Sequence, residues 1–374
     1  MAKHEKQEEQ KKKGGFFRTL LKVIGWILGI VVLLFVGLIG FLSATEYKPA
    51  TQEDIAVEGQ ATGTIKPGDD MKLMTWNIGY GALGDNADFF MDGGTSVYTA
   101  DEERVNSNMA GIIENIKAVD PDIALLQETD KDSDRSRHVN EYQMIQEALP
   151  DRTSSFANNF KVTFLPYPIP PIGKVDSGIA TFMKYQPTSA QRIQLPISFK
   201  WPIRMANLKR CLLINRVPVE GTDKELVVVN LHLEAYDSGD GKIAQTKRLV
   251  EILKQEYDKG NYVIAGGDLN QIFSSEDIDT FEVEEGLWAP GVIGVTLLKG
   301  RWWFLMDEKV PSCRSLDKPY EGADHDNFQY YLIDGFIISG NMRVKDYETM
   351  DLGFKNSDHN PVVVNLELRK NSDQ

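Results

Sequence analysis

Polar and ionisable residues end or interrupt several of the apolar runs in this sequence. They occur in six short motifs, "WNIG", "LLQETD", "VVNLHLE", "IAGGDLNQ", "LIDG" and "NSDHNP", which contain Asn77, Glu128, His232, Asp268, Asn270, Asp334, Asp358 and His359. A hydrophobic residue would be less costly to bury at each of these places. Because a buried carboxylate without a partner costs free energy, several of them together indicate ion pairing or metal coordination.

The residue types suit hydrolysis of a phosphate ester. Carboxylate and amide oxygens are the hard ligands that Mg²⁺ prefers, and a bound metal would neutralise charge on phosphoryl oxygens and activate water. Histidines can act as general base or acid, and a carboxylate can orient one of them. Each motif alone also has an ordinary interpretation, such as a turn, a solvated acidic loop or a satisfied core histidine.

Alternating hydrophobic patterns predict the elements that would position these residues. Strands are expected at 71–78, 122–129, 177–184, 211–219, 225–233, 261–269, 332–339 and 362–368. Amphipathic helices are expected at 101–119, ending before Pro121, and at 241–260, ending at Gly260. Many strands with few helices favour an α/β fold in which packed sheets are flanked by helices.

The order and wording of the six motifs, between Met71 and Leu368, resemble the endonuclease/exonuclease/phosphatase superfamily with the deoxyribonuclease-like fold. The resemblance implies a four-layer α/β sandwich, with two packed and mainly antiparallel sheets flanked by helices. It also implies a hydrolase of phosphoester bonds that depends on Mg²⁺, with Mn²⁺ or Ca²⁺ as alternatives. The family motif often reads Arg-Ile-Asp-Tyr, whereas Leu332 and Gly335 flank Ile333 and Asp334 in this chain.

The resemblance further implies a role for each motif residue. Asn77, Glu128 and Asp358 would bind the metal, with Glu128 as the main ligand. In the catalytic group, His232 would contact the scissile phosphate or assist the leaving group, Asp268 would position or activate water, Asn270 would bind phosphate, and Asp334 would orient His359. His359 itself would be a general base or stabilise the transition state.

An uncharged run of 20 residues, "VIGWILGIVVLLFVGLIGFL" at 23–42, matches the thickness of a bilayer core and predicts one transmembrane helix. A cleaved signal is the alternative, but signal apolar regions are usually about 7 to 15 residues long. Seven Lys and Arg precede the run and only Lys48 closely follows it. The positive-inside rule therefore predicts a single-pass cell-membrane protein with 1–22 cytoplasmic, a linker at 43–70 and an extracytoplasmic catalytic domain at 71–370.

Charge and cysteine content narrow the function classes. Beyond residue 50 there are 33 Lys and Arg against 51 Asp and Glu, a formal charge of −18. No basic run suggests a nucleic-acid surface, and the acidity suits divalent cations or simple solubility. Cys211 and Cys313 lie in no C-x-x-C pair, which argues against a thiolate zinc site and a disulfide framework.

The substrate stays open at this stage. Two segments, 164–175 and about 272–330, are predicted to be loops or insertions that set specificity, and the second contains Trp302-Trp303, a candidate lipid contact or a packing pair. Membrane tethering and acidity favour a lipid head group or a small phosphoester over nucleic acid. An extracytoplasmic nuclease and a catalytically inert, anchored binding module are the alternatives. No obligate protein partner is inferred, and His138 and His325 have no assigned role.

Overall fold

The computed structural model describes residues 2–237, 239–277 and 280–370, with the side chains of 2–14 left aside. The chain divides into two compact units, Met1–Glu46 and Tyr47–Gln374. The first unit is a single helix, α1 (Ala2–Thr45). Its segment Gly15–Thr45 is long and apolar enough to cross a membrane, and a signal sequence would share these properties. The predicted span at 23–42 lies inside this helix.

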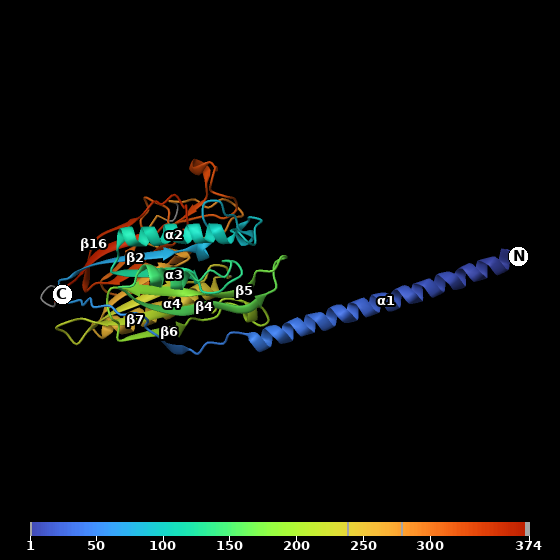
Figure 1. Cartoon of the computed structure of the whole chain (residues 1–374), viewed down its shortest axis with the longest axis horizontal. Helices are drawn as coiled ribbons and strands as arrows, with labels where there is room; N and C mark the ends of the chain where they lie inside the picture. The colour runs from blue at the N-terminus through green and yellow to red at the C-terminus, as the bar shows by residue number, and fades with distance from the viewer. Residues whose placement is uncertain (1, 238, 278–279, 371–374) are drawn as a thin grey trace. The chain divides into compact units, whose positions relative to one another are not determined.

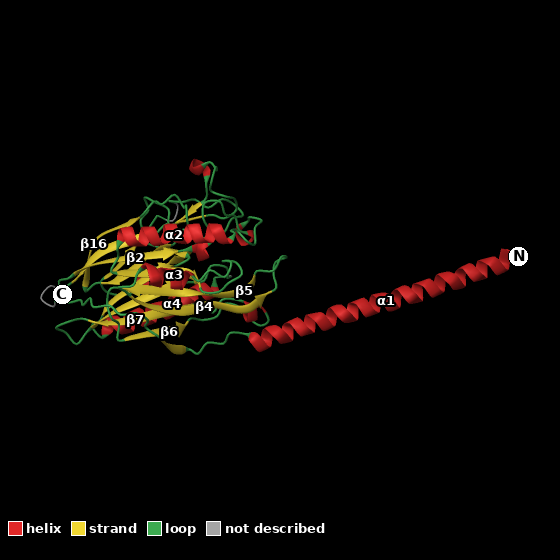
Figure 2. Cartoon of the chain, viewed as in Figure 1, coloured by secondary structure: helices red, strands yellow, loops and turns green. Residues whose placement is uncertain are grey.

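The second unit contains two large sheets (Figures 1 and 2). The six-stranded sheet has the order β16 (Met342–Thr349), β17 (Val362–Leu368), β2 (Asp70–Asn77), β3 (Ile123–Asp130), β5 (Gly173–Met183) and β4 (Thr153–Leu165). The seven-stranded sheet has the order β1 (Gln52–Ile55), β6 (Ser189–Gln194), β7 (Cys211–Pro218), β8 (Glu225–His232), β9 (Tyr262–Asp268), β15 (Asp334–Ser339) and β12 (Trp302–Leu305). Only β2–β3 and β8–β9 pair in parallel within these two sheets, so both are mainly antiparallel as predicted.

The core is arranged in layers. One cluster, including Leu73 and Leu125 of the six-stranded sheet and Ile264 and Phe336 of the seven-stranded sheet, fills the space between the sheets. A second cluster joins the outer face of the six-stranded sheet to α2 (Glu102–Val119) and α3 (Glu141–Ala148). A third joins the outer face of the seven-stranded sheet to α4 (Asp240–Asp258). The predicted four-layer α/β sandwich is therefore confirmed.

Every predicted strand overlaps an observed strand, and both predicted helices overlap α2 and α4. The pattern missed β4, whose "TSSFANN" start carries buried polar residues in place of an apolar alternation, and also β6, β16 and α3. The predicted bounds of two loops include residues that belong to strands. β4 and β5 include the ends of segment 164–175, and 302–305 forms the edge strand β12 of the main sheet, so it is not an insertion.

A polar contact ties α4 to β7. Glu256 near the end of α4 accepts hydrogen bonds from Arg216, from Lys259 and from the Asn261 side chain. Despite burial, these donors, Arg216 first, lower the pKa of Glu256 from 4.5 to about 2. The ionised carboxylate therefore stabilises the folded state, because its proton is lost more readily there than in the unfolded chain.

Replacing Glu256 by Gln is expected to lower the free energy of unfolding by roughly 1–3 kcal/mol at pH 7. Since the folded pKa is depressed, this stabilisation is complete above about pH 4.5 and disappears as the pH falls toward 2. Urea unfolding of both proteins at pH 7 and pH 3 measures it. The exposed Glu251→Gln variant on the same helix is the control, and an equal difference at both pH values would contradict the assignment.

Candidate active site

Sheet register places three of the motif residues beside one another. His232 and Asp268 are the last residues of the parallel strands β8 and β9 and pair with each other in the register. Asp334 is the first residue of β15, which runs antiparallel to β9, and it pairs with Asp268 on the other side. All three side chains are buried. The ends of three neighbouring strands therefore place one imidazole and two carboxylates together at one end of the strands of the seven-stranded sheet.

The six-stranded sheet contributes Asn77 and Glu128. Asn77 ends β2, and its side-chain amide donates to Oε1 of Glu128 at 3.3 Å. Glu128 lies where the register of β3 shifts against β5, and it has a left-handed φ of 52°. Such a bulge changes the direction of a side chain, and a left-handed φ is uncommon for a residue other than glycine. The carboxylate of Glu128 is half-buried, in contrast to the fully buried Asn77.

The "NSDHNP" motif forms the loop before β17, and several hydrogen bonds hold it. The Ser357 hydroxyl donates to the backbone oxygen of Asn77 at 2.8 Å and accepts from the His359 amide. The indole of Trp76 donates to the backbone oxygen of His359 at 2.8 Å. The end of β2 therefore fixes the loop that carries Asp358 and His359, both of which are buried.

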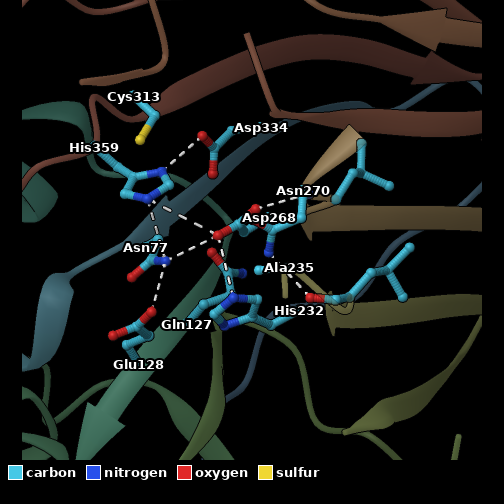
Figure 3. A network of polar contacts seen from close by, with 12 residues as sticks. Asn77, Gln127, Glu128, His232, Ala235, Asp268, Asn270, Cys313, Asp334 and His359 are labelled. Carbon is cyan, nitrogen blue, oxygen red and sulfur yellow. Dashed lines mark hydrogen bonds and ion pairs between the residues drawn. The ribbon is translucent and has the colours of Figure 1, made fainter. Parts of the chain in front are cut away.

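Asp268 is the centre of the network that joins the two sheets (Figure 3). Its Oδ2 accepts from the Asn77 amide at 3.0 Å, and it lies 3.2 Å from Nε2 of His232 and 3.9 Å from Nε2 of His359. His359 in turn contacts Oδ2 of Asp334 through Nδ1 at 2.8 Å. A carboxylate thus stands between two imidazoles, and a second carboxylate orients one of them.

Asn270 is held next to this network by its own backbone. It has a φ of 51°, and its amide N–H donates to Oδ1 of Asp268 at 2.9 Å. Its side-chain nitrogen donates to the backbone oxygen of Leu233 at 3.0 Å. These bonds fix the orientation of the Asn270 side chain beside His232 and Asp268.

The electrostatics of the cluster follow from burial and mutual proximity. Burial, and then the charge of Asp334, raise the pKa of Asp268 to about 7. Burial likewise raises the pKa of Asp358 to about 6. Burial opposes protonation of His359, but Asp334 and the other acidic groups outweigh it and raise its pKa well above the usual value. Burial and then Arg210 hold the pKa of His232 well below its ordinary range.

The donor set fits a divalent cation. Asp268, Asp334 and Asp358 are buried carboxylates within one cluster, and Oδ1 of Asp334 has no hydrogen-bond partner among the described residues. Two groups of side chains have ligand atoms within 4.8 Å of one another, Asp268–Asp334–His359 and Cys313–Asp358–His359. Burial raises the pKa of the Cys313 thiol to about 12, which leaves oxygen atoms as the dominant donors and suits hard cations.

The predicted metal set and these compact groups differ in part. Asp358 belongs to both, whereas Asn77 and Glu128 form a pair at the edge of the cluster, and Cys313 was not predicted to lie there. A two-residue bridge between Cys313 and His359 explains the proximity of the thiol. All eight residues predicted from the motifs are thus brought to one place, while Cys313 joins them through a pairing that its sequence position does not reveal.

Arg210 is a further residue that sequence reasoning missed. It directly precedes β7, whose register with β8 pairs Leu212 with Leu231, next to His232. Its side chain is buried, and Nε and Nη1 have no hydrogen-bond partner among the described residues. A buried cation without a partner is costly. The signal that could have found it is a basic residue at the start of an apolar strand in "LKRCLL".

A second, half-buried arginine supports the end of β3, the strand that carries Glu128. Arg135 makes two hydrogen bonds to the buried Asp130 carboxylate, at 2.9 and 3.1 Å, and its guanidinium stacks on the Tyr80 ring at 3.8 Å. Tyr80 is itself buried and has a φ of 40°. Because the ion pair is bidentate and shielded, it fixes the end of β3 directly behind Glu128.

The residues without an assigned role lie outside the network. His138 forms ion pairs with Asp132 and Asp134, and His325 stacks on Tyr320. Trp302 packs against Tyr257, and the indole of Trp303 donates to the backbone oxygen of Met342 at 3.3 Å. The tryptophan pair therefore has packing partners at the sheet edge, although Trp303 remains 39% exposed.

Residues 74–359 match the model of the Endonuclease/Exonuclease/phosphatase family. The chain belongs to this family. Its members are hydrolases that act on phosphoesters. The match includes all eight candidate site residues, from Asn77 to His359. A comparison with curated proteins found no matching relative.

Solved structures of the same family share the fold. An endonuclease/exonuclease/phosphatase from Beutenbergia cavernae superimposes with a TM-score of 0.55 at 17% identity, covering 80% of this chain and 72% of that one. One from Bacteroides vulgatus gives 0.51 at 14% identity, covering 80% and 100%. A family protein from Leptotrichia buccalis gives 0.51 at 14%, covering 79% and 99%. At these low identities the superpositions show the shared fold alone, and the substrate has to be inferred from the site.

Proposed function

We propose that this protein is a divalent-metal-dependent hydrolase of phosphoester bonds. The observation that carries the proposal is the Asp268 carboxylate, which lies between the imidazoles of His232 and His359 and hydrogen-bonds to Asn77. A family of phosphoester hydrolases and an oxygen-rich donor set both support it. Three polar side chains around one carboxylate suit proton transfer at a reacting oxygen better than they suit a structural core.

Glu128, Asn77 and Asp358 are the residues that would hold the metal. When bound, Mg²⁺ would supply charge neutralisation at the phosphoryl oxygens, and Mn²⁺ or Ca²⁺ would offer the same oxygen-ligand chemistry. The half-buried carboxylate of Glu128 is the most accessible of the three, which suits the role of principal ligand.

The chain's own residues divide the proton chemistry among them. Asp268 positions the attacking water and accepts its proton at Oδ2, the oxygen that already contacts Asn77 and His232. Asp334 holds Nδ1 of His359, so Nε2 of the imidazolium stabilises negative charge on the phosphoryl group. His232 contacts the phosphate near the leaving group, and Asn270 adds a polar contact beside it.

Arg210 is proposed to contact a nonbridging phosphate oxygen. Its guanidinium is buried, its Nε and Nη1 have no hydrogen-bond partner among the described residues, and its charge acts on His232, which together suit an anion. Arg210→Met is expected to lower kcat/KM about 10- to 100-fold, and Arg210→Lys less, since Lys restores the charge without the fork. Steady-state kinetics on bis(p-nitrophenyl) phosphate measure this. Arg248→Met is the matched control, because Arg248 is a half-buried arginine on α4 whose side chain pairs with Glu251. An unchanged kcat/KM in Arg210→Met would contradict the role.

Charge and membrane tethering favour a lipid head group or a small phosphoester as the substrate. The formal charge of −18 beyond residue 50 opposes a polyanion such as nucleic acid. The apolar helix at Gly15–Thr45 supports a single-pass anchor with the catalytic domain outside the cell. Labelling of the N-terminus from outside intact cells would contradict that topology.

Hydrolysis assays test the proposed function directly. The full-length protein is incubated with bis(p-nitrophenyl) phosphate, p-nitrophenyl phosphate, DNA and RNA, with Mg²⁺, Mn²⁺ or Ca²⁺ and with EDTA. Metal-dependent release of nitrophenol is expected and would favour a diesterase or a monoesterase according to the substrate. Preferred cleavage of DNA or RNA would favour the nuclease alternative. Turnover of no phosphoester with any metal would favour the inert binding module.

A further inference from the structure

Two loops carry a group of exposed apolar side chains at one end of the catalytic domain. The β4–β5 connection contains Tyr167 and Ile169, which are 69% and 94% exposed. The segment between β6 and β7 contains Trp201 and Ile203, which are 59% and 63% exposed. We call these four residues the apolar tip. Figure 1 shows the β4–β5 connection, in green, extending beyond the strands.

The two loops share one base. Val162, Ile172 and Val175 of the β4–β5 hairpin form a buried cluster, and Ala206 from the β6–β7 segment packs against it. Phe90 packs on the same cluster, and its ring lies 6.0 Å from that of Tyr167. The exposed side chains are therefore held on a packed platform. Large apolar groups presented together in this way mark an interaction surface.

The charge around the apolar tip differs from that of the rest of the domain. Segments 160–172 and 195–209 contain four Lys and Arg and no Asp or Glu, in a domain with 51 acidic residues beyond residue 50. Lys161 is paired with Asp176, and the amine of Lys209 donates to the backbone oxygen of Arg204. Lys200 and Arg204 lie at the surface of the second segment. Local basicity with exposed Trp and Tyr suits the headgroup region of an anionic bilayer.

The chain enters the catalytic domain next to these loops. The guanidinium of Arg192 lies over the ring of Tyr47, the first residue of the second unit, 5.8 Å from the ring centroid. Arg192 donates to the backbone oxygens of Asn158 in β4 and of Lys209 after the second loop. The apolar helix ends at Thr45, and one residue spans at most about 3.6 Å. A membrane-spanning α1 would therefore keep Tyr47 close to the bilayer surface.

The apolar tip is also linked to the active site. Phe90, which contacts Tyr167, begins the short turn Phe90–Asp92. The Asp92 carboxylate accepts a hydrogen bond from the hydroxyl of Tyr236 at 2.8 Å. Tyr236 follows β8 four residues after His232. One turn thus connects the platform of the tip to the loop that leaves the catalytic strand end.

We propose that the apolar tip docks on a bilayer that contains anionic lipids, and that the substrate is a phosphoester in the head group of a lipid in that bilayer. The second half rests on the proposed hydrolase function, and the first does not. Trp201 and Ile203 enter the interface between headgroups and acyl chains, while Lys200 and Arg204 meet lipid phosphates. A soluble phosphate ester, a second copy of this chain and a protein partner are the competing occupants.

Vesicle binding by residues 47–374 tests the docking. This segment contains its own core, because none of the buried clusters among the described residues includes a residue before Ile55. Co-sedimentation with vesicles of phosphatidylcholine and phosphatidylglycerol is expected, with weaker binding to phosphatidylcholine alone. The double variant Trp201→Ser/Ile203→Ser is expected to bind at least about tenfold more weakly. The matched control is Val292→Ser/Tyr347→Ser, which alters two exposed apolar residues elsewhere.

Hydrolysis assays separate docking from catalysis. The double variant should hydrolyse bis(p-nitrophenyl) phosphate like the unaltered domain, which also shows that it is folded, and should lose activity on phospholipid vesicles at least about tenfold. Equal vesicle binding by both proteins would overturn docking. Self-association that the double variant abolishes would assign the tip to a second copy instead. Turnover of bis(p-nitrophenyl) phosphate without turnover of vesicle lipid would overturn only the lipid substrate. Hydrolysis of no phosphoester at all would overturn the proposed function, and vesicle binding would then still test docking.

Discussion

Replacement of Asp268 by asparagine should lower kcat/KM for bis(p-nitrophenyl) phosphate by about 10³-fold or more. The change removes the proton acceptor but keeps the shape that packs between His232 and His359. General acid–base catalysis typically raises the rate by about 10²- to 10⁴-fold. When residues act as a unit, removing any one of them loses most of this rate enhancement, so the effects of two substitutions do not add. The double variant Asp268→Asn/His359→Ala should therefore be little worse than either single variant.

Stability separates this loss from misfolding. Burial and Asp334 raise the folded pKa of Asp268 to about 7. The metal-free protein therefore loses stability as the pH rises from the unfolded pKa near 3.8, and the loss is complete above pH 7, where the folded carboxyl is ionised. Asp268→Asn should thus unfold in EDTA at the same temperature as the parent protein or higher at pH 8. Asp307→Asn, which alters a buried aspartate that binds the Thr349 amide elsewhere, is the activity control. Activity within a few-fold of the parent in Asp268→Asn would contradict the mechanism.

The second large effect is expected from metal removal. EDTA should abolish hydrolysis, and Mg²⁺ in excess should restore it. Glu128→Gln should lower kcat/KM about 10²-fold or more at fixed Mg²⁺ and raise the Mg²⁺ concentration that gives half-maximal activity, because an amide is a weaker ligand than a carboxylate. Titration with Mg²⁺, Mn²⁺ and Ca²⁺ measures both quantities and ranks the ions.

Glu147→Gln is the matched control for this experiment, since Glu147 is an exposed glutamate on α3. It should leave the metal dependence unchanged. Hydrolysis that resists EDTA would contradict a metal-dependent reaction. A normal Mg²⁺ titration in Glu128→Gln would move the principal ligand to one of the compact groups around Asp358 and His359.

Sequence patterns predicted the strands that carry the site because those strands are buried on both faces and read as long apolar runs. β8 and β9 are examples: β8 differs from the expected strand by one residue at its end only, and β9 differs by one residue at each end. The same patterns missed β4, because Ser155 makes a buried hydrogen bond to Asn215 and so breaks the hydrophobic alternation. They also treated Trp302 and Trp303 as part of an insertion, although tertiary pairing with β15 makes them an edge strand.

By itself, the sequence determined which residue types stand at strand ends, and these supported the predicted reaction class, since their identity and order are local properties of the chain. Only the tertiary structure decided how they combine. The register of β9 and β15 sets Asp268 beside Asp334, and the packing of the two sheets brings Asn77 and His359 to the same carboxylate. The tertiary structure also revealed Arg210, Cys313 and the apolar tip, because burial, exposure and proximity depend on contacts between segments far apart in sequence.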